Sequence, residues 1–473
     1  MIPPIEEQTC ILTLQAARPG GVPTVVDWWH TFLTEWGHQA TVLYAAYEEE
    51  PISYIERLRR TFHTWNTHIQ AEFAIRTLAS AAPPVPIWLF YLVPQWLLGS
   101  VFSRFDQIVF AGGPIHAAIA PVLRGFPVII WMGTLYDDEL SGKAAVGDKW
   151  AEGILKSRFL PILGWQETFV LHHAPRILVQ SPYTLGRIAE KFPEIHKKLD
   201  LVMVPVDTDI FVPLLEESKS AQRYVLNISR INDPRKNIPL LLEAFSLVAS
   251  IESDLYLILA GDDPVQSLIN YCNQLGIQDR VVFRGQVSKD DLVRLYQNAE
   301  LMVISSAQEG LGIAMLEAIS CGTPVVATDC GGPEGIVIED ITGCIVTNYD
   351  VNKLAGAITK LLQNPAKLKR LRASCREFAL QNWSKTVIEQ KLRSHFISVF
   401  PNSIAAHQYL ENENGYSKAL VKLNQVQKNN RPQEILALLW CVLIVAAYIQ
   451  HQAILHWNAI QSSILDPLLN ILQ

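Results

Sequence analysis

The sequence is poor in charge, and in positive charge above all. Only 18% of its 473 residues are charged, and 39 lysines and arginines stand against 46 acidic residues, which gives a net charge of −7. A protein that binds nucleic acid through its phosphates carries an excess of basic residues. The lack of such an excess excludes nucleic acid as a partner.

Cysteine is scarce and scattered. The seven cysteines are odd in number and show no metal-ligand spacing. We therefore expect reduced thiols, most of them buried. The first ten residues also lack the basic start and the apolar core of a secretory signal, so we expect the body of the protein to stay on the cytoplasmic side.

Uninterrupted apolar runs are short, whereas a helix needs about 20 apolar residues to cross a bilayer. The run Ile87 to Phe102 is broken by a proline and a glutamine, which is consistent with a buried, interdomain or membrane-surface helix. Ile435 to Ile449 is unbroken, and Gln450 to Trp457 extends it with few charges. We expect a C-terminal membrane anchor over 435–457; the alternative is a helix packed on the body or on a second subunit.

The rest of the chain alternates strand-like apolar runs with amphipathic helical stretches. Cys10 to Gln15 predicts a strand, Gly20 and Gly21 open a helix, and Ala40 to Ala46 predicts the next strand. This order is typical of an α/β protein with parallel sheets. The aromatic and arginine-rich segment Ile52 to Ala82 is predicted to be helical.

The most informative stretch is Ser305 to Pro324, SSAQEGLGIAMLEAISCGTP. It places Glu309 in a glycine turn after one strand and Glu317 about two turns along the following helix, so both carboxylates can face one ligand. Gly310 and Gly312 allow close approach of the backbone, and the helix N-terminus suits a phosphate. A helical carboxylate suits a ribose and a loop carboxylate suits a sugar ring. Together they indicate a sugar nucleotide.

Two glutamates at this spacing also occur on a solvated helix face. Glu317, however, lies within the apolar run IAMLEAI. An unpartnered charge there would cost on the order of several kcal/mol, so we expect Glu317 to have a partner.

The motif E-G-L-G-x4-E resembles the retaining glycosyltransferases of family 4, the group 1 type with the GT-B fold. The continuation from Cys321 to Val337 fits as well, and the resemblance covers roughly residues 9 to 400. It implies two Rossmann-like domains that face a central cleft. It also implies a hexosyltransferase that uses a nucleotide-diphosphate sugar without a metal or other cofactor. The acceptor would be a hydroxyl of a glycan, a lipid-linked saccharide or a glycolipid, as in polysaccharide biosynthesis.

The resemblance assigns roles to matching positions in this motif. It implies that Glu309 contacts the donor sugar and that Glu317 holds the ribose. The backbone amides of Gly310, Leu311 and Gly312 would meet the diphosphate.

Cations and a second glycine loop complete the implied site. Arg230 and Lys236 stand where the family has an arginine and a lysine that grip the diphosphate, and Arg235 competes for the role of the lysine. Because no metal motif is evident, these cations must neutralise the departing diphosphate. Gly20 and Gly21 match a loop beneath the donor phosphate, although a simple tight turn has the same spacing.

One position departs from the family pattern. The family has a His-Gly pair near the donor, and here Met132 precedes Gly133. The missing histidine puts the usual acceptor-side chemistry in question. Thr134, Asp137 and Asp138 are the candidate substitutes.

The same resemblance predicts the domain organisation. We expect an N-terminal acceptor-side domain over 1–208 and a nucleotide-sugar-binding domain over 209–385. A crossover helix over 386–410 would return to the first domain, and 411–473 would form a polar linker and the apolar C-terminal helix.

Two other functions stay open. Met132 favours a subunit that binds a sugar nucleotide without turnover and serves a membrane glycan assembly, whereas the intact set of cations and glutamates argues against it. A nucleotide-sugar epimerase of the same fold is the second alternative. The nucleotide base, the sugar and the acceptor depend on loops that no motif fixes.

Overall fold

The computed structural model describes residues 7–13, 21–46, 65–70, 75–81, 102–157, 160–214 and 222–406, with 44–46, 65–70 and 75–81 described by their backbone alone. Gly20, the run from Ile87 up to Val101 and the whole C-terminal segment from His407 lie outside these residues, and so does the expected anchor. No helix in the described part of the chain is long and apolar enough to cross a membrane.

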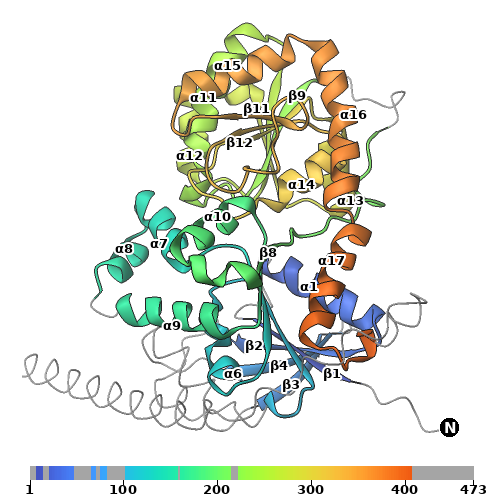
Figure 1. Ribbon diagram of the computed structural model, residues 1–473. Helices are drawn as coiled ribbons and strands as arrows, with labels where there is room; N and C mark the ends of the chain where they lie inside the picture. The colour runs from blue at the N-terminus through green and yellow to red at the C-terminus, as the bar shows by residue number, and fades with distance from the viewer. Residues whose placement is uncertain are drawn as a thin grey trace, which may run out of the picture.

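The first domain is built on an eight-stranded sheet with the order β3-β4-β2-β1-β5-β6-β7-β8 (Figure 1). All neighbouring strands are parallel except β3 and β4. Its central strands are buried along nearly their whole length, as in parallel sheets covered on both faces. The strands are β1 (Gln8–Leu12), β2 (Gln39–Ala46), β3 (Trp65–Gln70), β4 (Ile75–Ala81), β5 (Gln107–Ala111), β6 (Val128–Met132), β7 (Arg176–Val179) and β8 (Leu199–Leu201).

Helices connect these strands. The first one buries Val25, Trp29 and Phe32 on the sheet, because these residues recur at helical spacing. The helices are α1 (Gly21–Glu35), α6 (Ile119–Leu123), α7 (Tyr136–Ala145), α8 (Lys149–Leu155), α9 (Leu160–His173) and α10 (Pro182–Lys191), with 3-10 turns η1 (Ile115–Ala118) and η2 (Pro193–Lys198).

The helical prediction for Ile52 to Ala82 is wrong where the structure describes this segment. Residues 65–70 and 75–81 are the strands β3 and β4, which pair in antiparallel fashion, and β4 adds to β2. Each strand holds one threonine and one isoleucine, and β-branched residues favour extended structure. The aromatic and arginine content suggested a helix, but pairing with neighbouring strands determines the structure of these residues.

The second domain has a six-stranded parallel sheet with the order β11-β10-β9-β12-β13-β14. Its strands are β9 (Tyr224–Ser229), β10 (Tyr256–Gly261), β11 (Val281–Gly285), β12 (Leu301–Ile304), β13 (Val325–Thr328) and β14 (Gly343–Val346). Its helices are α11 (Ile238–Ile251), α12 (Gln266–Gln274), α13 (Lys289–Asn298), α14 (Ile313–Ser320), α15 (Val351–Leu362) and α16 (Pro365–Asn382), with 3-10 turns η4 (Pro234–Lys236) and η5 (Gln278–Arg280).

The order of these strands marks a ligand position. The chain moves outward from β9 to β11 and then returns to place β12 beside β9. In open α/β sheets, ligands bind outside the carboxyl ends of the strands at such a switch point. The loops that follow β9 and β12 carry the predicted cations and the glutamate motif.

The last described helix, α17 (Lys385–Val399), returns to the first domain and runs beside α1 (Figure 1). Trp36 Nε1 donates to Glu389 Oε1 at 2.9 Å, and the rings of Trp36 and Phe396 lie 5.5 Å apart. Lys385 pairs with Glu35 at 2.5 Å. One apolar cluster continues from α1 through α14 to α17, so the two domains share a core.

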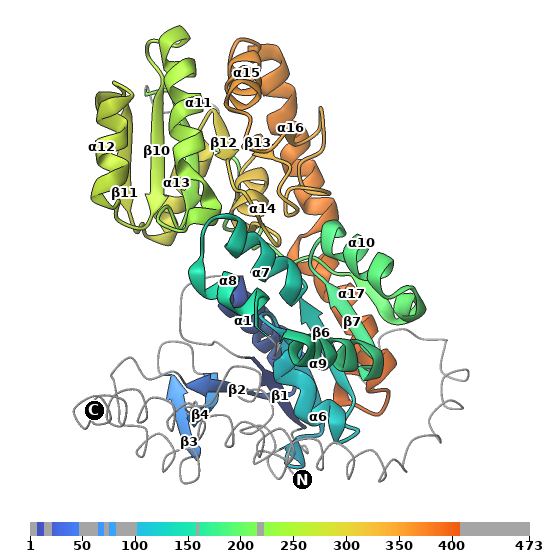
Figure 2. The ribbon, with the colours of Figure 1, turned by 90° about the vertical axis from the view of Figure 1, so that its left-hand side faces the viewer.

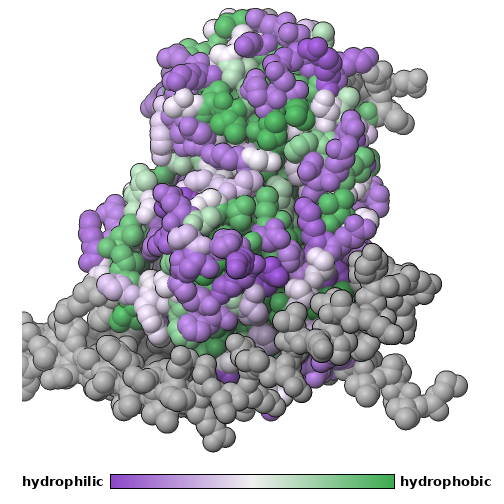
Figure 3. Space-filling model, in the orientation of Figure 1, coloured by the Kyte–Doolittle hydropathy of each residue, from purple (hydrophilic) through white to green (hydrophobic). Residues whose placement is uncertain are grey.

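The outer surface fits a chain with little charge. The face drawn in Figure 3 mixes polar and apolar residues over both domains. Single exposed apolar side chains are normal on protein surfaces and by themselves indicate no binding site.

Candidate functional site

The loops after β9 and β12 meet at the carboxyl edge of the second sheet. Ala307 N donates to Arg235 O at 2.7 Å, and Ser305 Oγ donates to Lys236 O at 2.9 Å. These backbone contacts bring the predicted cations against the loop of Glu309.

Lys236 and Glu309 form the centre of this arrangement. Lys236 Nζ pairs with Glu309 Oε1, and Ser306 Oγ donates to the same oxygen at 2.8 Å. The two charged side chains are only 15% and 11% exposed. A pair this poorly solvated holds both side chains in place, because removal of either partner would leave a buried charge.

The two arginines of the turn differ in exposure. Arg235 binds Asp233 through two nitrogens, at 3.1 and 2.7 Å, and is 16% exposed. Arg230 also contacts Asp233, at 3.0 Å, but is 59% exposed. Burial raises the pKa of Asp233, but the hydrogen bonds and charge of Arg235 outweigh this and hold it below its usual value. Lys236, rather than Arg235, therefore occupies the position beside Glu309.

Glu317 has the partner that its sequence context predicts. Tyr296 of α13 is fully buried and donates its hydroxyl to Glu317 Oε2 at 2.8 Å. Burial raises the pKa of Glu317 to about 7, against the opposing hydrogen bond from Tyr296 and the charge of Lys289. The prediction of a partner is confirmed.

Two helix N-termini face each other at the domain junction. Gly312, the N-cap of α14, has a left-handed φ of 77°, and a Cβ there would also collide with the Met315 side chain. Gly21 opens α1, and a Cβ on it would lie 3.7 Å from Ile313 Cδ1 of α14. The first N–H groups of a helix have no partner within that helix, and the positive ends of the two helix dipoles lie near each other here, which favours an anion.

Gly133 of the first domain lies against the loop of residues 305–312, which we call the donor loop after the role that the sequence predicts for it. A Cβ on Gly310 would lie 3.7 Å from Gly133 O and 4.0 Å from Thr134 Cβ. Thr184 Oγ1 of α10 donates to Gly133 O at 2.7 Å and fixes this turn. The backbone of the first domain therefore rests on the glycine turn of the second.

Met132 is a core residue. It is fully buried in the apolar cluster that covers one face of the first sheet. Asp137 and Asp138 are engaged with α10, through Lys191 at 2.7 Å and Arg187 at 3.1 Å respectively. Of the three candidate substitutes for the family histidine, the structure places Thr134 beside the donor loop.

Comparison with known proteins identifies the family. Residues 215–379 match the family model described as glycosyl transferases group 1. The D-inositol 3-phosphate glycosyltransferase of Mycolicibacterium smegmatis is 30% identical over 241 residues, which cover 48% of this chain and 54% of the relative. The protein of the same name from Mycobacterium tuberculosis strain H37Ra is 29% identical over 374 residues, covering 70% and 75%. Residues 215–379, the greater part of the second domain, therefore belong to the group 1 glycosyltransferases.

The likeness has a limited span. The chain spans about half the length of the first curated relatives that it matches, at 54% and 50%. The solved structures cover more of it. Sucrose-phosphate synthase from Thermosynechococcus elongatus has a TM-score of 0.66 at 19% identity, covering 84% of this chain and 100% of that one. The Anabaena protein HepE, solved with UDP, has a TM-score of 0.64 at 17% identity, covering 83% and 100%. The predicted GT-B fold is confirmed.

Sequence reasoning did not single out α7, a helix of the first domain that contacts the turn of residues 230–236 in the second domain. Gly142 of α7 packs on Gln308, the residue before Glu309. Burial lowers the pKa of Arg235, but the hydrogen bond and charge of Asp233 outweigh this and raise it. The charge of Glu139 on α7 adds to the rise. A glycine in the interior of a helix was the available signal.

A buried carboxylate anchors the start of α7. Glu167 of α9 accepts a hydrogen bond from Tyr136 N at 2.9 Å and is 2% exposed. Burial raises the pKa of Glu167 to about 7 against this hydrogen bond. The start of α7, the helix that contacts the donor loop, is therefore bound by Glu167, whose pKa is about 7.

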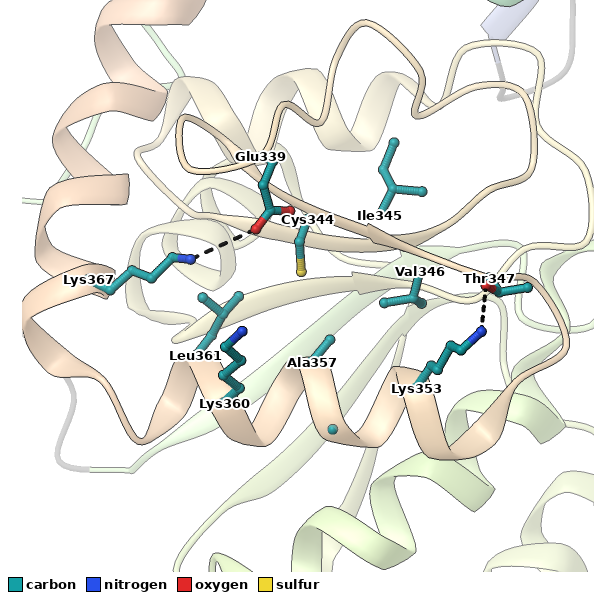
Figure 4. A pocket seen from close by; sticks show the side chains of 11 residues that line it. Glu339, Cys344, Ile345, Val346, Thr347, Lys353, Ala357, Lys360, Leu361 and Lys367 are labelled. Carbon is teal, nitrogen blue, oxygen red and sulfur yellow. Dashed lines mark hydrogen bonds and ion pairs between the residues drawn. The ribbon is translucent and has the colours of Figure 1, made fainter.

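A pocket of 390 Å³ lies away from this site, between edge strand β14 and α15 (Figure 4). It is lined by Lys353, Lys360 and Lys367 among others. Two of these amines have partners, with Lys367 lying 3.9 Å from Glu339 and Lys353 donating to Thr347 Oγ1 at 3.0 Å. None of the predicted site residues lines it. In the described ranges no cluster of three or more His, Cys, Asp or Glu is placed to hold a metal ion.

Proposed function

We propose that this chain transfers a hexosyl group, with retention, from a nucleotide-diphosphate sugar to a hydroxyl of a glycan, a lipid-linked saccharide or a glycolipid. The observation that carries this proposal is the Lys236–Glu309 ion pair at the switch point of the second sheet. It places a cation and a hydrogen-bond acceptor beside the N-terminus of α14. A sugar diphosphate needs both at adjacent positions.

Each part of the donor has a counterpart in the site. The ribose hydroxyls would donate to Glu317, one of whose oxygens is already bound by Tyr296. The diphosphate would meet Lys236, the exposed Arg230 and the N–H groups that begin α14. The hexose would donate its hydroxyls to Glu309. Charge on the leaving diphosphate is then neutralised by two side-chain cations and a helix dipole, without need of a metal.

The proposed reaction proceeds on one face of the sugar. The bond between the anomeric carbon and the diphosphate oxygen breaks, and the acceptor oxygen bonds to the same face of that carbon. The acceptor proton passes to the departing diphosphate, which serves as the base. Cations fixed before the reaction stabilise the charge that develops on the diphosphate, which is commonly a large contribution to catalysis.

UDP-glucose is the first donor to test. The Anabaena structures that share this fold include complexes with UDP and glucose and with UDP-glucose. We also propose that the acceptor is part of polysaccharide biosynthesis and that the C-terminal segment over 435–457 brings the enzyme to a membrane. Both of these rest on the sequence.

A subunit without turnover is the second candidate, favoured by the burial of Met132 in the core at the position of the family histidine. A donor panel separates the two. Purified protein is incubated with UDP-, GDP- and ADP-sugars plus glycan and lipid extracts, and nucleotide diphosphate release is measured. Release from one donor, with an unchanged anomeric configuration in the product, supports the transferase. Tight donor binding without release supports the second candidate, and inversion would remove the one-face reaction. A new sugar epimer formed without acceptor would indicate the epimerase.

A further inference from the structure

Gly142 occupies an unfavourable place for a glycine. It is the seventh residue of the ten-residue helix α7, and it is not among the described glycines that have a positive φ. Glycine in a helix interior destabilises the helix relative to alanine. An alanine would suit this backbone, so the reason for the glycine must lie outside the helix.

That reason is contact with Gln308. A Cβ on Gly142 would lie 2.6 Å from Gln308 Cγ, 2.9 Å from its Cβ and 3.1 Å from its Cδ. Rotation of the Gln308 side chain can move its Cγ and Cδ but leaves its Cβ in place. Any larger residue at 142 must therefore move either α7 or the backbone of the donor loop.

The donor loop is supported on its other side. Glu309 N donates to Cys330 O at 2.9 Å, and a Cβ on Gly332 would lie 2.6 Å from Glu309 Cβ. The loop is therefore packed between α7 and the turn after β13. Figure 2 shows α7 at the top of the first domain, directly below the second. The clash made by a larger residue at 142 would push α7 and the donor loop apart.

We propose that Gly142 is a positioning residue whose bare backbone docks on Gln308 and so fixes Glu309 against the first domain. This inference rests on the proposed glycosyl transfer. Gln308 directly precedes Glu309, so a displacement of one moves the other. Gly142 touches no substrate in this account and acts only through the loop.

The test is a double-mutant cycle. Gly142→Ala should lower kcat by roughly 10-fold or more with little change in donor KM, because the displaced donor loop misplaces Glu309. Gln308→Gly removes all three clashing carbons. In that background, Gly142→Ala should lower kcat by less than about 3-fold.

Gly164→Ala in α9 is the matched control, since a Cβ there meets nothing within 4 Å. It should gain helix stability without loss of kcat. An equal loss from Gly142→Ala in both backgrounds, or no loss in either, would overturn the proposal while leaving glycosyl transfer intact.

A second readout does not depend on turnover. Hydrogen exchange at the amides of residues 305–312 should be faster in Gly142→Ala than in wild type, and in the Gln308→Gly background Gly142→Ala should leave the rates unchanged. Identical exchange in wild type and Gly142→Ala would contradict the docking role. A wild-type protein that is inactive with every donor would count against the proposed function, and hydrogen exchange would still decide the role of Gly142.

Discussion

Two buried carboxylates, Glu167 and Glu317, set the behaviour of this protein near neutral pH. Both have a pKa raised by burial from 4.5 to about 7. The folded protein therefore holds protons that the unfolded chain has already lost between about pH 4.5 and 7. Their contribution to stability is complete below about pH 4.5 and is lost as the pH rises through 7.

Glu167→Gln should remove part of this loss of stability at high pH. The amide oxygen can still accept the hydrogen bond from Tyr136 N, and no buried charge forms at high pH. We expect the variant to be more stable than wild type at pH 8, by on the order of 2 kcal/mol, and nearly equal to it at pH 5. Denaturant unfolding at the two pH values measures this. Glu152→Gln, at a half-exposed glutamate of α8, is the control. Equal stability of Glu167→Gln and wild type at pH 8 would contradict the role of burial at Glu167.

Glu317 should make nucleotide binding depend on pH. Its ionised carboxylate accepts ribose hydroxyls, whereas the protonated form has lost part of that capacity. Calorimetric affinity for the nucleotide diphosphate should fall several-fold from pH 8 to pH 6 in wild type. In Glu317→Gln the affinity should be weak at both pH values. A wild-type affinity that does not change between these pH values would argue against the ribose contact.

At the scale of single elements, the N-terminus of α14 depends on Gly312. Its φ of 77° is strained for any residue with a Cβ, by about 1 to 2 kcal/mol, and the Met315 contact adds to this. Gly312→Ala should lower stability by at least that amount and weaken donor binding, because the amides that begin α14 shift. Gly356→Ala in α15 is the control, since its Cβ meets open space. Wild-type donor affinity in Gly312→Ala would refute the phosphate role of this turn.

The same element shows how far sequence reasoning reaches. The unit from β12 to α14 is local, so its strand, glycine turn and helix follow from residue order, as does the partner required by Glu317. The pairing of β3 with β4 and the contact of Gly142 with Gln308 join residues that no local pattern connects. The burial of Met132 likewise depends on its packing in one cluster with residues of η1, α7 and α9, which lie elsewhere in the chain.

At the scale of the whole molecule, the two domains are held at several points. The helix α17 packs on α1, and the glycine turn of the second domain rests on Gly133. The motif residues come from the second domain, and the first domain supplies the N-terminus of α1 and the backbone at 133. The charge is mildly negative overall, so the cations near the donor loop act locally rather than by long-range steering.

The central claim is that Glu309, paired with Lys236, takes part in glycosyl transfer at this junction. The most direct test is the initial rate of nucleotide diphosphate release with the preferred donor in wild type, Glu309→Gln and the control Glu339→Gln. Glu339 lines the outer pocket and is 66% exposed. The account predicts a loss of roughly 100-fold or more in Glu309→Gln and an unchanged rate in Glu339→Gln. A wild-type rate in folded Glu309→Gln would contradict it.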